Sequence, residues 1–307
     1  MLWARRAELA DAIDGDHVNP DYLPDHQLCE DLSATSDLGE ALDGADAVFV
    51  AVPSHGFRET LERMDGHVGD DVPVVSLTKG FEQRSHKRMT ELIEEILPGR
   101  PAGALAGPNL AKEILDGYAA AAVIAMTDTG CAREIQGVLR QPLFRIYEGD
   151  DIIGVEVAGA LKNVIAIAAG MAEGLGVGDN PRAMVITRGL AEITRLGVAM
   201  GGEPATFAGL TGLGDLMATC MSPLSRNRRV GEELARGKTI EEVIEGMNQV
   251  AEGVKSARTV MELAADHACE MPIAAEVDAV VNEGRTPQEA YRGLARPAAE
   301  HELHGVA

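Results

Sequence analysis

A single lysine, Lys162, lies within GVEVAGALKNVIAIAAG (residues 154–170), where the other side chains are nearly all small or aliphatic. Burying an ammonium group without a partner costs several kcal/mol, and its usual consequence is a pKa lowered by as much as about 3 to 5 units. A lysine tuned in this way is a general acid or base near neutral pH. The alternative is a helix lysine whose stem covers apolar surface while its ammonium group reaches water.

The segment SRNRR (225–229) places three arginines within four residues of an otherwise acidic chain. Arginine binds phosphate with two parallel hydrogen bonds, and Ser225 and Asn227 could donate to the same group. The alternative is a solvated helix face that balances Glu232 and Glu233. The contrast with the net charge favours an anion site.

Other polar residues stand where chemistry is expected in a sheet protein. Asp215 follows two glycines at a predicted helix start, where it could cap the helix or orient and tune a lysine. Three predicted strands end in polar pairs, which are Ser54 and His55, Thr78 and Lys79, and Pro108 and Asn109. Strand ends need turn residues in any case, but ligands of parallel sheets bind at this edge.

The composition excludes several classes of partner. The net charge is −22, from 49 acidic and 27 basic residues, and six of the basic residues are lysines. Such a surface repels nucleic acid and anionic membranes, because both need a cationic footprint. An acidic, lysine-poor surface also suggests a halophilic protein, with an ordinary acidic mesophile as the alternative.

The cysteines and the N-terminus indicate a cytoplasmic protein. Cys29, Cys131, Cys220 and Cys269 are far apart and form no C-x-x-C pair, so we expect neither a metal site nor a disulfide framework. The stretch MLWARRAELADAID is too charged for a signal peptide, and we expect no apolar run long enough to span a membrane.

The elements that must position these residues fall into two halves. Up to about residue 150, apolar runs at 45–53, 72–80, 102–108, 120–126 and 144–149 alternate with helical patterns such as FRETLERM (57–64). This alternation predicts an α/β Rossmann-like fold with a doubly wound, mostly parallel sheet over residues 1–150. Residues 151–307 carry long helical patterns broken by glycine-rich turns at 174–181 and 209–215, which predict an all-α domain.

The start of the chain departs from the expected pattern. A dinucleotide-binding domain opens with a strand followed by G-x-G-x-x-G, whereas MLWARR is typical of the end of the second strand. We therefore expect an N-terminally incomplete sheet, with roughly thirty residues preceding Met1, since the first strand and the glycine loop have no counterpart. Arg5 and Arg6 occupy the position where an acidic residue would bind a ribose 2′-hydroxyl and an arginine would accommodate an NADP 2′-phosphate, so they favour NADP. Exposed charges after a strand are the alternative.

In order, the segments resemble NAD(P)-dependent glycerol-3-phosphate dehydrogenases of the bacterial type. The resemblance runs from Leu2 to roughly Pro272, and its most specific parts are the block around Lys162 and the SRNRR segment. The matching stretches are LWARR, NPDYLP, VAVPSH, LTKGFE, AGPNLAKE, GALKNVIAIAAGMAEGLGVGDNPRAMVITRGLAE, GLTGLGDLMATC, SRNRRVGEEL and VAEGVKSA.

The resemblance implies a reversible hydride transfer between sn-glycerol 3-phosphate and dihydroxyacetone phosphate, with NADP or NAD as cofactor. It implies that Lys162 accepts and donates the proton and also contacts the substrate. The other substrate contacts that it implies are Lys79, Gly107, Asn109, Asp215, Ser225, Arg226 and Asn227. Family members more often have Ser or Thr in place of Asn109, which changes the length and donor count of that side chain.

The implied cofactor contacts come from both halves of the chain: Arg5, Arg6, Tyr22, Lys79, Ala111, Arg226, Val250 and Glu252. Because the glycine loop has no counterpart, the pyrophosphate site at its helix N-terminus is missing, and we expect reduced cofactor affinity. A homodimer is the commonest oligomer of soluble enzymes and is expected here. Two other interpretations of the function stay open. The chain could be a 3-hydroxy acid dehydrogenase or ketopantoate reductase with the same two-domain architecture, or an inactive protein that binds ligand poorly or acts only as a subunit scaffold.

Overall fold

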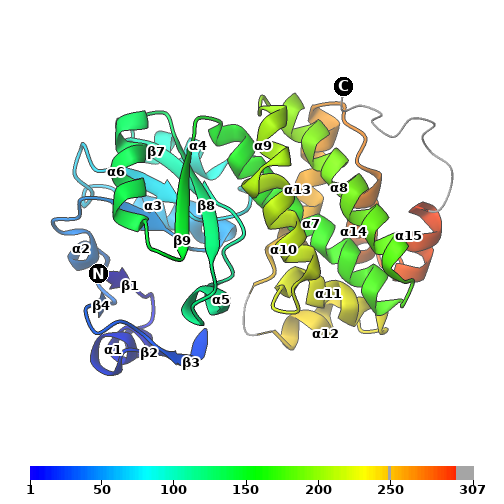
Figure 1. Cartoon of the computed structure of the whole chain (residues 1–307), viewed down its shortest axis with the longest axis horizontal. Helices are drawn as coiled ribbons and strands as arrows, with labels where there is room; N and C mark the ends of the chain where they lie inside the picture. Colours follow the sequence, from blue (N-terminus) through cyan, green and yellow to red (C-terminus); the bar gives the residue numbers. More distant parts are fainter. Residues whose placement is uncertain (248–249, 295–307) are drawn as a thin grey trace.

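The computed structural model describes residues 1–247 and 250–294, and the remainder of the predicted helical half, 295–307, lies outside the described residues. A sheet-containing half and a helical half lie side by side (Figure 1). The sheet half contains β1 (Leu2–Trp3), α1 (Ala7–Asp16), β2 (Val18–Asn19), β3 (Leu23–Gln27), β4 (Ala34–Thr35), α2 (Leu38–Leu42), β5 (Val48–Val50), the 3₁₀ turn η1 (Ser54–Gly56), α3 (Phe57–Met64), β6 (Val74–Ser76), α4 (Met89–Ile96), β7 (Ala102–Ala106), α5 (Ala111–Leu115), β8 (Ala120–Met126), α6 (Thr129–Leu139) and β9 (Phe144–Gly149).

The main sheet has five strands in the order β5-β6-β7-β8-β9. Its pairs are parallel except for β7 and β8, which run antiparallel with Leu105 opposite Ile124. Alternate residues of β7 face opposite sides, so Leu105 packs under α6 while Ala104 and Ala106 pack with Val155 of the helical half. Both faces of the sheet are covered, which confirms the predicted mostly parallel α/β fold.

The first strand pairs outside this sheet. β1 pairs in parallel with β4, with Leu2 opposite Ala34, and the two form a sheet of their own. β2 and β3 form a second, antiparallel pair. In the described part of the chain, β5 is hydrogen-bonded to β6 alone, so the β1–β4 pair is not joined to the main sheet through backbone hydrogen bonds.

The second half is helical throughout its described residues, as predicted. Its elements are α7 (Ile152–Gly174), α8 (Asp179–Ala199), α9 (Pro204–Ala208), the π-helical turn η2 (Leu210–Gly214), α10 (Asp215–Met221), α11 (Arg226–Ala235), α12 (Ile240–Glu245), α13 (Glu252–Asp266), α14 (Pro272–Asn282) and α15 (Pro287–Leu294). The sequence at 209–215 predicted a turn, but these residues continue into α10 as one wide helical turn.

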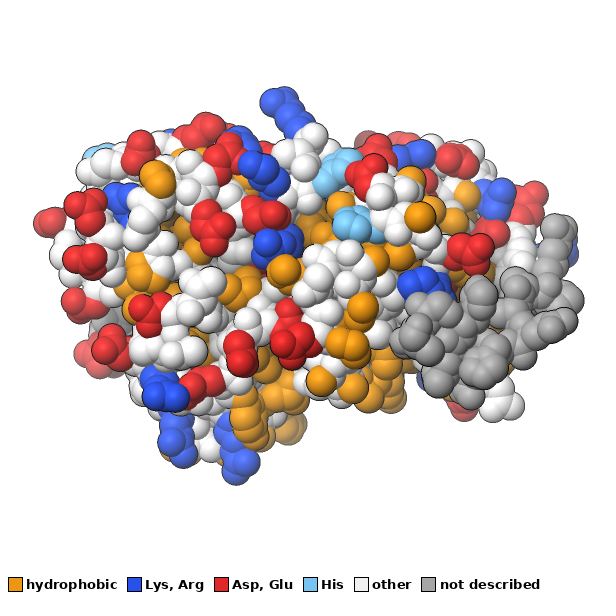
Figure 2. Space-filling model, turned by 90° about the horizontal axis from the view of Figure 1, so that it is seen from above, with side chains coloured by type: hydrophobic (Ala, Val, Ile, Leu, Met, Phe, Trp, Pro, Cys, Tyr) orange, Lys and Arg blue, Asp and Glu red, His pale blue; other side chains and the backbone are white. Residues whose placement is uncertain are grey.

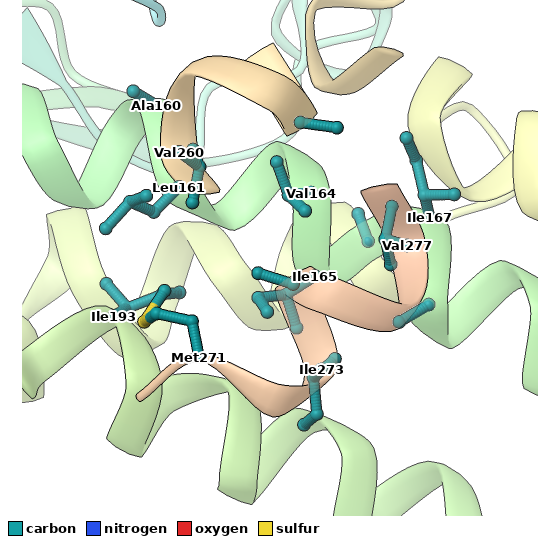
Figure 3. Close-up of a cluster of buried hydrophobic side chains, with 14 of the residues drawn as sticks. Ala160, Leu161, Val164, Ile165, Ile167, Ile193, Val260, Met271, Ile273 and Val277 are labelled. Carbon is teal, nitrogen blue, oxygen red and sulfur yellow. The ribbon is translucent and has the colours of Figure 1, made fainter. Parts of the chain in front are cut away.

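Helix α7 is the centre of the helical half. Ile165 and Val164 of α7 pack among Ile193 of α8, Val260 of α13 and Ile273 of α14 (Figure 3). By length and composition, α7 could cross a membrane, which departs from the expectation of no such run. Within the protein, however, 89% of the most apolar 18-residue stretch of α7 is buried, so the rest of the protein covers its apolar surface.

Helices α7 and α11 cross at very short range because glycines meet at the crossing. A Cβ atom on Gly170 would lie 2.0 Å from the carbonyl oxygen of Arg228, and one on Gly231 would lie 2.1 Å from that of Ile167. Any larger residue would push the helices apart. This close crossing fixes the SRNRR segment, which opens α11, against the helix that carries Lys162.

The surface agrees with the composition. Figure 2 shows acidic side chains spread over the face seen from above, with fewer basic side chains between them. The four cysteines are free. In the described residues, no group of three or more His, Cys, Asp or Glu side chains is arranged to hold a metal ion.

Candidate active site

Lys162 lies in the middle of α7 and points into the protein. The residue is 5% exposed. Its Nζ donates to Oδ1 of Asp215 and, at 2.8 Å, to Oγ1 of Thr219, both on α10. The ammonium group therefore does not reach water along the helix surface, which was the alternative interpretation of this residue.

Asp215 joins Lys162 to the sheet half. It is 3% exposed and is the first residue of α10, where its carboxylate does not cap the helix. Its second oxygen, Oδ2, accepts from Nζ of Lys79 at 2.8 Å. Lys79 follows β6, and its Nζ also donates at 3.0 Å to the carbonyl oxygen of Gly107 and to Oδ1 of Asn109. Five of the predicted substrate residues, Lys162, Asp215, Lys79, Gly107 and Asn109, thus meet in one cluster.

The charges of Lys162, Asp215 and Lys79 favour proton transfer by Lys162. Burial, followed by repulsion from the Lys79 ammonium group, lowers the pKa of Lys162 to about 7, against the attraction of Asp215. Burial would raise the pKa of Asp215, but the two ammonium groups hold it below its usual value. Near neutral pH, Lys162 can therefore both take up and release a proton while Asp215 stays ionised.

The carbonyl group that holds Lys79 requires a glycine. Gly107 has φ 151°, and a Cβ atom there would lie 2.6 Å from the carbonyl oxygen of Ala121 and 2.8 Å from Cα of Ala122. Both clashes are with the neighbouring strand β8, which cannot move aside as a flexible side chain could. The loop after β7 can thus approach β8 and present its carbonyl oxygen to Lys79 only because residue 107 has no side chain.

A buried amide chain connects the site to α11 and α13. Asn163 donates through Nδ2 to the carbonyl oxygen of Lys79 at 3.1 Å. Its Oδ1 accepts from Asn227 at 2.9 Å, and Oδ1 of Asn227 accepts from the backbone N–H of Gly253 at 2.9 Å. Asn227, predicted to bind substrate, is 7% exposed, and among the described residues one of its two Nδ2 hydrogens has a partner.

The residues of the SRNRR segment make different kinds of contact. Ser225 caps α11, since its Oγ accepts from the backbone N–H of Arg228 at 3.2 Å. Arg228 forms ion pairs with Glu232 and Glu173, as the face-balancing alternative expected. Arg226 instead donates from Nη1 to the carbonyl oxygen of Val250 at 2.8 Å. The helix N-terminus and Arg226 are thus directed toward the segment before α13.

Apart from Lys79 and Arg226, the predicted cofactor residues lie at the edges of this arrangement. Arg5 and Arg6 directly precede α1, both are exposed, and Arg6 is paired with Asp21. Tyr22 is 44% exposed, and Ala111 opens α5. Glu252 opens α13 and accepts from the backbone N–H and the Oγ of Ser54, at 3.1 and 2.7 Å, so it joins the end of β5 to the helical half.

Two polar residues of the site were not predicted from the sequence. Thr219, whose Oγ1 accepts from Lys162 and donates to the carbonyl oxygen of Asp215 at 2.6 Å, lies one helical turn after Asp215. Asn163 follows Lys162 directly. Its amide group stands in an apolar helix, which is the same signal that marked Lys162, and it could have been found by that signal.

Comparison with known proteins gives a consistent result. The family models described as NAD-dependent glycerol-3-phosphate dehydrogenase N-terminus and C-terminus match residues 1–132 and 151–292. The chain is 57% identical over 304 residues to NAD(P)+ glycerol-3-phosphate dehydrogenase 2 of Sphingopyxis alaskensis, covering 99% of this chain and 91% of that protein. It is 55% identical over 306 residues to the NAD(P)+ enzyme of Mycobacterium avium, covering 99% and 90%.

A solved structure has the same fold. The crystal structure of glycerol-3-phosphate dehydrogenase from Coxiella burnetii matches with a TM-score of 0.93 and 35% identity, covering 96% of this chain and 91% of that one. The likeness spans both halves, and the family models match both the segment that carries Lys79 and the helices that carry Lys162 and Asp215. The chain therefore belongs to the NAD-dependent glycerol-3-phosphate dehydrogenase family.

Proposed function

We propose that this chain catalyses reversible hydride transfer between sn-glycerol 3-phosphate and dihydroxyacetone phosphate, with Lys162 as general acid and base. The observation that carries the proposal is the buried chain Lys162–Asp215–Lys79, in which the pKa of Lys162 is lowered to about 7. The family relation supports the substrate and the redox chemistry. The geometry supports the role of the lysine.

In the oxidation direction, Lys162 takes the proton of the substrate hydroxyl group as the carbinol carbon loses hydride. The carbon–hydrogen electron pair leaves with the hydride, and the oxygen–hydrogen pair becomes the second bond of the ketone. In reduction, Lys162 returns the proton to the forming alkoxide, which its positive charge also stabilises. Thr219 and Asp215 hold the ammonium group, so its direction is fixed before substrate binds.

The substrate phosphate is assigned to the start of α11. Arg226 supplies a guanidinium group and Ser225 lies at the helix N-terminus, where N–H groups and the helix dipole favour an anion. Asn227 can donate its remaining amide hydrogen. Lys79, held by Gly107 and Asn109, contacts the substrate on the sheet side.

The chain's residues fit a nicotinamide dinucleotide, which supplies the hydride acceptor or donor when bound. Arg5 and Arg6 offer two adjacent exposed guanidinium groups after β1, a donor set suited to a 2′-phosphate. Tyr22, Ala111, Lys79, Arg226, Val250 and Glu252 complete the proposed contacts. The arginine pair favours NADP.

The setting of the enzyme is also proposed. Four free cysteines support a cytoplasmic enzyme. The net charge of −22 supports a halophilic source, and a homodimer is the oligomer we propose. The products serve glycerophospholipid or carbohydrate metabolism, depending on the direction of the reaction.

The test replaces Lys162 with Ala and measures both directions of the reaction. Turnover should fall about a hundredfold or more while circular dichroism stays unchanged, because a positioned acid–base group contributes at least that factor. Lys238→Met, an exposed lysine paired with Glu233, is the matched control. Near-normal turnover of Lys162→Ala would rule out the proposed role. Unphosphorylated dihydroxyacetone should be a poor substrate.

A further inference from the structure

One face of α7 holds the segment that carries Lys79. Glu156, Gly159 and Asn163 are spaced i, i+3, i+7 and therefore share a helix face. Asn163 binds the carbonyl oxygen of Lys79, and a Cβ atom on Gly159 would lie 3.5 Å from Cγ of Lys79, so the lysine stem passes directly over this glycine. Asn163 and Gly159 therefore hold one end of the segment.

Glu156 holds the other end. It is 6% exposed, and within residues 1–247 and 250–294 its hydrogen-bond partners lie at the start of α4 in the sheet half. Its Oε1 accepts from the backbone N–H of Thr90 at 2.9 Å. Its Oε2 accepts from Oγ1 of Thr90 at 2.5 Å and from Nη1 of Arg88 at 2.8 Å. One carboxylate thus receives two neutral donors and one guanidinium group.

The segment between the two ends is also anchored to the helical half. Phe81 is 2% exposed and belongs to the hydrophobic core of the helical half. Gln83 donates to the carbonyl oxygen of Lys255, and His86 contacts Glu262. Residues 79–90 thus lie on the helical domain along their length, although they belong to the sheet half. Displacement of either end would move the backbone that carries Lys79.

We propose that Glu156 is a positioning residue for the active site: it holds the start of α4 on α7 and thereby fixes Lys79 beside Asp215 and Lys162. The inference rests on the proposed function of Lys162. Glu156 itself does not touch the reacting groups, since its partners are Arg88 and Thr90. Its effect is transmitted through residues 79–90.

This role has a signature that a purely structural carboxylate lacks. The charged groups that act on Lys162 are Lys79, which lowers its pKa, and Asp215, which raises it. The Cys220 thiol of α10 also interacts with Lys162, and burial raises the pKa of that thiol, so it is neutral in the assay range. If Lys79 moves away, Lys162 loses the repulsion and keeps the attraction, so its pKa rises. The charged group that faces Glu156 is Arg88, which in turn contacts Glu91. A change at Glu156 therefore reaches Lys162 only by displacing Lys79.

The experiment compares Glu156→Gln with Glu192→Gln in the full chain. Glu192 is the matched control because it is also buried and also accepts from the start of a helix, through Ile273 and Ala274 of α14. For Glu156→Gln, kcat should fall about tenfold, and the pH at which oxidation becomes half-maximal should rise by about half a unit to one unit. Glu192→Gln should leave that pH unchanged.

A second measurement does not depend on turnover. Amide hydrogen exchange of residues 77–90 should be faster in Glu156→Gln than in wild type, and unchanged in Glu192→Gln. If Glu156→Gln does not fold, Thr90→Val removes one donor with little change of shape and should shift the same pH in the same direction by less.

The possible failures are distinguishable. If Lys162→Ala retains turnover, the proposed function fails whatever Glu156 does. If Lys162→Ala is inactive while Glu156→Gln, or Thr90→Val in its place, keeps the wild-type pH profile and the wild-type exchange of residues 77–90, the positioning role is overturned and the proposed function stands.

Discussion

Replacement of Lys79 by Met isolates the electrostatic control of Lys162. Lys79 and Lys162 bind the two oxygens of one carboxylate, Asp215. Two unit charges about 5 Å apart interact by about 3 kcal/mol at an effective dielectric constant of about 20, which corresponds to about 2 pKa units. Because methionine fills similar space without the charge, the pKa of Lys162 should rise from about 7 by about one to two units.

The sign of this shift determines what the assay must show. Oxidation requires neutral Lys162, so kcat/KM for glycerol 3-phosphate rises with pH through the pKa of Lys162, and this rise should move to higher pH in Lys79→Met. Reduction requires the protonated form, so its fall at high pH should move in the same direction. The pH at which each profile rises or falls does not depend on the overall activity that is lost with the proposed substrate contact of Lys79.

The measurement is a pair of pH–rate profiles between pH 5.5 and 10, with Lys238→Met as the control for removal of an exposed lysine. The control should superimpose on wild type after scaling. Profiles of Lys79→Met that stay in place, or move to lower pH, would refute the view that Lys79 holds down the pKa of Lys162. The shift in Lys79→Met is also the upper limit for the one expected of Glu156→Gln.

Three further predictions concern stability, loop geometry and cofactor choice. Burial raises the pKa of Glu192 to about 7, so its contribution to stability is complete below its unfolded pKa of about 4.3 and is lost as the pH rises through 7. Unfolding temperatures of wild type should therefore fall relative to Glu192→Gln between pH 5 and 8, whereas parallel curves would contradict the prediction. Gly107→Ala should lower kcat about tenfold or more, because the new Cβ atom displaces the carbonyl group that holds Lys79. Arg6→Ala should weaken binding of 2′,5′-ADP about tenfold and leave 5′-AMP unchanged in calorimetry, and equal losses for both would exclude a 2′-phosphate contact.

The fold was predictable where local patterns determine it. The strand predictions at 120–126 and 144–149 coincide with β8 and β9, and FRETLERM coincides with α3. The runs at 45–53 and 72–80 predicted strands that are longer than β5 and β6 are in the structure. The residues after each strand leave the sheet and lead to Ser54 and to Lys79. The antiparallel pairing of β7 with β8 was not predicted, since hydrophobic periodicity does not encode strand direction.

The site was predictable only in part, because residues that meet in it are far apart in the sequence. Lys162 is conspicuous because its neighbours in sequence are apolar. Its partner Asp215 is 53 residues away, and Lys79 is 136 residues from Asp215, so the sequence left the role of Asp215 open between a helix cap and a lysine partner. Glu156 is also a charged residue in the apolar stretch 154–170, but its partners depend on which face of α7 meets the sheet half, which the sequence does not give. The proposed incomplete sheet before Met1 stays a prediction.

The lysine that we propose as the proton carrier is thus tuned in part from outside its own half of the molecule. Burial is the largest cause of the lowered pKa of Lys162, and it acts against the attraction of Asp215 within the helical half. The sheet half adds the second ammonium group, through a segment that lies on α7. Proton transfer near neutral pH therefore requires that the two halves be held in register. A buried carboxylate at this contact serves a purpose that an apolar pair would not, because its donors fix one geometry of the segment that carries Lys79.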